Sequence, residues 1–107
     1  MIPLLLWGAS VAYDPKPILA EMDASRTAFM ACIRADIVRL GTGNAETVDN
    51  ILMAVRSTCR RAEESMRSAY NASPMSRSKI EDLIIRYRST AESDGAAALL
   101  AARHTRP

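Results

Sequence analysis

The hydrophobic positions of this chain repeat with the period of an α-helix. Over residues 17–40 and again over 45–70, apolar side chains recur three, four and seven residues apart, which places them on one face of a helix. The two stripes consist of Ile18, Met22, Phe29, Cys32, Ile33 and Leu40, and of Val48, Ile51, Leu52, Val55, Cys59, Ala62, Met66 and Tyr70. A short connection rich in glycine, residues 41–44, separates them and predicts an antiparallel helical hairpin.

A third helix is expected over residues 76–90, where Ser78 and Glu81 have the spacing of a capping box. The polar stretch 89–95 suggests a loop or frayed helix, and a short C-terminal helix can follow over 95–103. The composition agrees, because unbranched aliphatic residues are plentiful and aromatic residues make up only 5% of the chain. The predicted fold class is all-α.

The first twelve residues differ in character from the rest of the chain. Residues 1–12 carry no charged side chain and end in Ser10-Val11-Ala12, small residues typical of a signal-peptidase site. No lysine or arginine precedes the apolar run, and twelve residues are fewer than the usual minimum of about 15. The segment is therefore interpreted as an apolar leader or partial signal peptide, with an arm packed onto the helices as the alternative. Residues 13–17 form a proline-rich linker, and 18–104 a single small helical domain.

The two cysteines of the chain lie one on each predicted helix of the hairpin. The register of an antiparallel hairpin places Cys32 opposite Cys59, both on inward-facing stripes, so that a disulfide is geometrically plausible. The alternative is a pair of buried, reduced cysteines in the cytosol. The same register places Asp36, a charged residue on an apolar stripe, next to Arg56. Asp36 is therefore predicted to form an ion pair with Arg56 or with Arg39.

One cysteine per helix in a short hairpin behind an apolar leader resembles the small, uncharacterised exported helical proteins of bacteria. The resemblance covers residues 29–70 and consists of spacing and pattern. It implies a periplasmic or secreted location, with the cytoplasm as the alternative, and such proteins have no established activity to carry over. A membrane span is not expected, since a helix needs roughly 20 apolar residues to cross a bilayer.

The residues also bear on the class of function. No glycine-rich phosphate loop or metal-ligand cluster is present in the sequence, and the single histidine is His104, so neither catalysis, a cofactor, a metal nor a small-molecule ligand is expected. The expected role is structural or protein-interacting, with self-association through Ile85 and the C-terminal Ala/Leu segment. The alternative is a cytoplasmic nucleic-acid-binding protein that uses basic residues at positions 56, 60, 61, 67, 77, 79, 86 and 88. Interleaved Glu63 and Glu64 argue against this alternative, as does a net charge of only +2.

Overall fold

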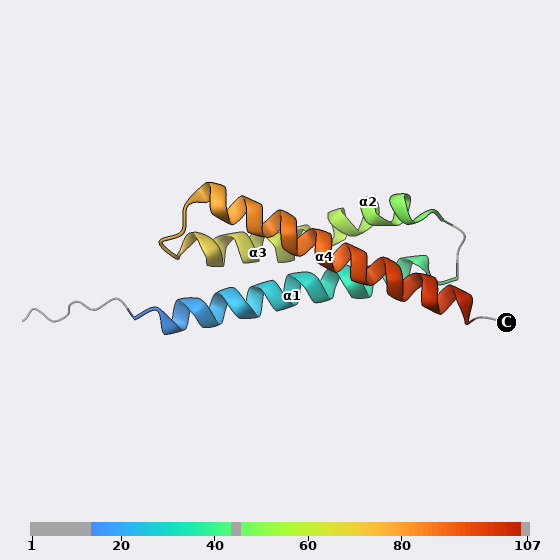
Figure 1. The fold of residues 1–107 in the computed structure, drawn as a ribbon, viewed down its shortest axis with the longest axis horizontal. Coiled ribbons are helices and arrows are strands. Elements are labelled where there is room, and N and C mark those ends of the chain that lie inside the picture. Colours follow the sequence, from blue (N-terminus) through green and yellow to red (C-terminus); the bar gives the residue numbers. More distant parts are fainter. Residues whose placement is uncertain (1–13, 44–45, 106–107) are drawn as a thin grey trace, which may run out of the picture.

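The computed structural model describes residues 14–43 and 46–105, and this part of the chain is built from four α-helices (Figure 1). They are α1 (Lys16–Gly41), α2 (Val48–Thr58), α3 (Arg60–Asn71) and α4 (Arg77–His104). The all-α prediction is confirmed. The predicted leader and Tyr13 of the predicted linker lie outside the described residues. α1 begins within that linker, so that Lys16 and Pro17 belong to its first turn.

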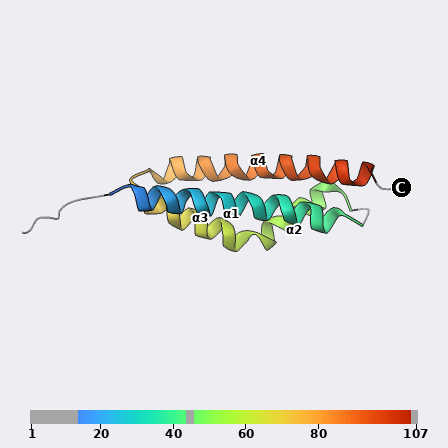
Figure 2. The same ribbon diagram turned by 90° about the horizontal axis from the view of Figure 1, so that it is seen from below.

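The helices are arranged as three elongated rods. α1 runs the length of the bundle, α2 and α3 return along it, and α4 runs forward again in the direction of α1 (Figures 1 and 2). Together α2 and α3 occupy the position of the second helix of the predicted hairpin. The third rod, α4, begins beside α3 and converges on α1 toward the C-terminal ends of both helices, and it runs in the same direction as α1 (Figure 1).

α4 is a single helix of 28 residues where the sequence suggested a helix, a loop and a further short helix. The polar stretch 89–95 continues the helix and turns three residues inward, namely Ala91, Glu92 and Gly95. A separate helix of nine residues would be marginal in water. Residues 95–103 are stable as a helix here because they continue the preceding turns of α4 and pack against α1.

The structure corrects the predicted cap of the third helix and identifies the cap of α2. Ser76 rather than Ser78 is the N-cap of α4, since its side chain accepts a hydrogen bond of 3.2 Å from the Lys79 amide. Thr47 caps α2 by accepting from the Asn50 amide at 3.3 Å. Both capping residues have extended backbone angles, which let a hydroxyl turn back toward the first free amides of the helix.

The core combines aliphatic, methionine and aromatic side chains from all four helices. Its most deeply buried large members are Phe29, Ile33, Ile37, Val55, Met66, Ile80, Ile84 and Leu99. At the contact between α1 and α4, a Cβ atom built on Gly95 would lie 2.7 Å from Ile37 Cδ1 and 3.2 Å from the Arg34 Cα atom. Glycine at this position therefore lets the two helix backbones approach closely.

Candidate functional site

The two cysteines meet at the middle of the bundle. Cys32 on α1 and Cys59 between α2 and α3 have their sulfur atoms at disulfide distance, with 6.0 Å between the Cα atoms. That separation is near the usual value for a disulfide. Cys59 is 2% exposed, and Cys32 packs against the same core. The structure thus brings together the two residues that the hairpin register placed opposite each other.

The rod formed by α2 and α3 is interrupted at Cys59. This residue has φ −93° and ψ 12°, away from ideal helical values, although its amide still donates to the Val55 carbonyl at 2.8 Å. Neither glycine nor proline occurs between residues 46 and 71, so no residue type in this stretch demands the break. The break coincides with the crosslink, where the returning rod is joined to α1.

The predicted ion pair between Asp36 and Arg56 is wrong. Asp36 is 6% exposed, and its Oδ1 atom accepts a hydrogen bond of 2.9 Å from Nε of Arg39, the other partner considered for it. Arg56 instead reaches across to α4 and forms a two-pronged contact with Glu92, at 2.7 and 2.9 Å. Sequence reasoning did not identify Glu92, because a polar stretch expected to be a loop or frayed helix gives no sign of a buried carboxylate on α4.

A second set of ion pairs joins α3 to α4. Arg67 makes a two-pronged contact with Glu81, at 2.8 and 3.0 Å, and donates to Glu63 at 3.2 Å. Glu63 also pairs with Arg88 of α4. The hydrogen bond from Arg67 lowers the pKa of Glu81 below its usual value, and the same bond raises the pKa of Arg67. These ion pairs hold α3 against α4. They also pair Arg67 and Arg88, two of the basic residues that nucleic-acid binding would use, with glutamates.

The end of α4 is tied to the connection between α1 and α2. Arg103 donates to the backbone carbonyls of Gly41 and Glu46, each at 3.0 Å from Nη2. An arginine near a helix C-terminus is well placed to satisfy carbonyls that lack a partner within their own helix. The sequence contained no signal for this contact, because the partners are backbone atoms more than 50 residues away.

Two tyrosines and an arginine form a cluster between α1, α3 and α4. The rings of Tyr70 and Tyr87 meet edge to face with 6.3 Å between centroids, and the Arg26 guanidinium lies 5.7 Å from the centre of the Tyr87 ring. Tyr70 is 3% exposed. Burial raises the pKa of Tyr70 from 10.0 to about 12, because the charged phenolate would lose its hydration.

The raised pKa of Tyr70 predicts a loss of stability in strong alkali. Between pH 10 and pH 12 the unfolded chain releases this proton while the folded chain retains it, so the free energy of unfolding falls as pH rises. The loss is on the order of 3 kcal/mol for a shift of this size. Urea unfolding at a series of alkaline pH values measures it, with Tyr70→Phe as the variant whose stability should fall less over the same range. An equal decline in both proteins would contradict the assignment to Tyr70.

Two further findings concern binding chemistry. Within residues 14–43 and 46–105, no group of three or more histidine, cysteine, aspartate or glutamate side chains is placed to hold a metal ion. In the same part of the chain, no helix has both the length and the apolar character needed to span a membrane.

Comparison with models of protein families, with curated proteins and with solved structures finds no match to this chain.

Proposed function

We propose that this chain is a disulfide-stapled helical protein with a structural or protein-interaction role in the periplasm or outside the cell. The observation that carries the proposal is the position of Cys32 and Cys59 at disulfide distance in the middle of the bundle. Disulfides persist in oxidising compartments and are rare in the cytosol. In this proposal the apolar residues 1–12 act as a leader that a signal peptidase removes after Ala12, which leaves Tyr13 as the first residue.

A role in protein interaction draws support from the surface of α4. Ile85 and Leu100 lie on this helix with more than half of each side chain exposed. Single exposed apolar residues are common in monomeric proteins, so these two side chains support rather than define a contact surface. The Ala/Leu-rich C-terminal half of α4 favours self-association through this helix as the form of interaction.

The alternative, cytoplasmic nucleic-acid binding, finds less support in the geometry. Of the basic residues between positions 56 and 88, Arg56, Arg67 and Arg88 are engaged by glutamates. A paired arginine releases fewer counterions on meeting a phosphate, which weakens the electrostatic term that dominates such binding.

The intact mass of the protein purified from its native host tests the proposal. Mass spectrometry with and without reductant is expected to show a gain of two hydrogen atoms on reduction, and alkylation of the unreduced protein should leave both cysteines unmodified. A mass that begins at Tyr13 would add support for a signal peptide. A reduced chain that shifts DNA on a gel at physiological salt would overturn the proposal in favour of the alternative.

A further inference from the structure

The junction between α2 and α3 lacks the residue types that usually break a helix. Residues 46–71 contain neither glycine nor proline. α3 also begins at Arg60 without a side-chain cap, whereas Thr47 caps α2 and Ser76 caps α4. Arginine, alanine, glutamate and methionine, which favour helices, recur on both sides of the junction. Local preferences therefore favour one continuous helix over residues 48–71, and the break needs another cause.

The backbone at this junction departs from a helix at a single residue. Cys59 has φ −93° and ψ 12°, against about −63° and −42° in a regular helix. Its amide donates to the Val55 carbonyl at 2.8 Å, and its carbonyl accepts from the Glu63 amide at 3.1 Å, both with helical spacing. Rotation of this one residue would join the two helices. The amides of residues 60–62 would then gain partners that the first turn of a separate helix lacks.

The disulfide joins α1 to this same residue. The Cα atoms of Cys32 and Cys59 lie 6.0 Å apart, and the bond restricts that separation to the narrow range that a disulfide allows. Figure 2 shows that the returning rod is bent where α2 meets α3. We infer that the crosslink maintains this break, and that reduction of the bond lets α2 and α3 join into one helix over residues 48–71.

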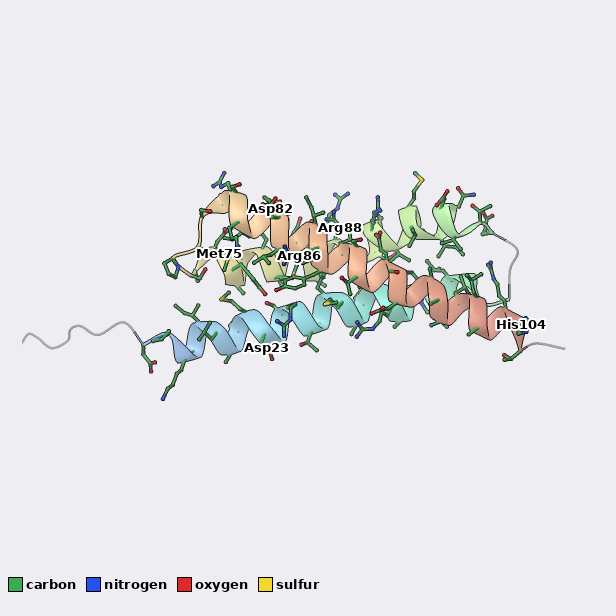
Figure 3. The ribbon with its side chains drawn as sticks, viewed as in Figure 1. Asp23, Met75, Asp82, Arg86, Arg88 and His104 are labelled. Carbon is green, nitrogen blue, oxygen red and sulfur yellow. A yellow bond between two sulfur atoms is a disulfide. The ribbon has the colours of Figure 1, made fainter. Side chains whose placement is uncertain are left out.

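α2 rather than α3 is expected to change direction when the two helices join. The ion pairs of Arg67 and Arg88 tie α3 to the first half of α4, far from His104 at the other end of that helix (Figure 3). α2 is tied to α4 by the ion pair of Arg56 with Glu92, in which the Arg56 side chain is 55% exposed. A pair with one largely exposed partner contributes little to stability. Straightening of the rod therefore separates Arg56 from Glu92 and changes the position of α2 relative to α4.

This inference rests on the disulfide of the proposed function and makes that bond a redox-sensitive control of α2. A dithiol such as dithiothreitol supplies the two electrons and two protons that the change requires. One thiolate of the reductant attacks a sulfur of the Cys32–Cys59 bond and forms a mixed disulfide, and the released cysteine takes up a proton. The second thiol of the reductant then displaces the other cysteine and leaves as a cyclic disulfide. The bent form is thus the resting state in an oxidising compartment.

Amide hydrogen exchange measured by NMR tests the inference on the oxidised protein, on the protein reduced with dithiothreitol and on Cys32→Ala. The variant keeps Cys59 and its surroundings but cannot form the bond. The amides of residues 60–62 should exchange about tenfold more slowly in the reduced protein and in Cys32→Ala, because they gain helical partners. Loss of the crosslink lowers overall stability and would by itself speed exchange, so slower exchange at these three positions identifies the joined helix.

Met30→Ala is the matched control, since it shortens another partly buried side chain of α1 and leaves the bond intact. Its residues 60–62 should exchange as fast as those of the oxidised wild-type protein, and slow exchange there would overturn the inference.

The other outcomes separate the inference from the proposed function. Fast exchange at residues 60–62 in both bond-free proteins would overturn the inference alone, because packing rather than the crosslink would then hold the break. Loss of the helical circular dichroism spectrum in both would also overturn it, since no reduced fold would exist. Cysteines that alkylate in unreduced protein from the native host would overturn both proposals, because the bond itself would be missing.

Discussion

Replacing Cys32 and Cys59 with alanine is expected to lower the free energy of unfolding by about 3.5 kcal/mol. The crosslink joins residues 27 positions apart, and a closed loop of that length restricts the unfolded chain by an amount of this order in the chain-entropy model. A protein of this size has a total stability of about 5–15 kcal/mol, so the crosslink supplies a large share. The loss should exceed that of removing any one of the surface ion pairs.

Thermal unfolding followed by circular dichroism measures this effect. The double alanine variant should unfold about 15–25 °C below the oxidised protein, given the usual conversion for a domain near 100 residues. Reductant should lower the melting temperature of the wild-type protein to a similar value and leave that of the variant unchanged. Wild-type protein whose melting temperature does not respond to reductant, and equals that of the variant, would show that the cysteines do not form the bond.

Replacing Gly95 with leucine is expected to lower the free energy of unfolding by about 2–3 kcal/mol, despite the better helix propensity of leucine. Gly95 faces α1, and even a single Cβ atom would meet the side chain of Ile37 and the backbone at Arg34. A full leucine side chain has no space between the two helices, so α4 would have to move away from α1. That movement would expose core side chains that both helices now bury.

Ala97→Leu is the matched control for this prediction. Ala97 lies on the same helix and is exposed, so the same new side chain finds open solvent there. We expect its stability in urea unfolding to remain within about 0.5 kcal/mol of the wild-type value. If both variants lost the same amount, close packing of α1 against α4 would not explain the role of Gly95.

The hairpin could be predicted because its signals are local. Helical periodicity identifies which face of each segment avoids water, and the short connection then limits how the two stripes can meet. Cys32 and Cys59 share those stripes, so their meeting follows from periodicity and register together. The break at Cys59 could not be foreseen in this way, since nothing in the local residues interrupts the helix.

The ion pairs were less accessible to sequence reasoning. Arg39 was one of two partners considered for Asp36, and it lies on the same helix, where spacing alone brings them together. Arg56 and Glu92 are 36 positions apart, and their contact depends on how α4 crosses α2. The stretch 89–95 was expected to be a loop or frayed helix, because an inward-facing polar helix segment has a similar composition, and this expectation left the contact unpredicted.

By itself, the sequence determined the fold class, the two stripes of the hairpin and the pairing of its cysteines, because each depends on local helical periodicity. Only the tertiary structure decided that residues 77–104 form one continuous helix. Polar residues with modest helix propensity become helical there because Ala91 and Gly95 let α4 lie close against α1, and packing over that length outweighs local preference. The tertiary structure likewise formed an apolar groove between the start of α1 and residues 73–75, since its two walls come from segments more than 50 residues apart.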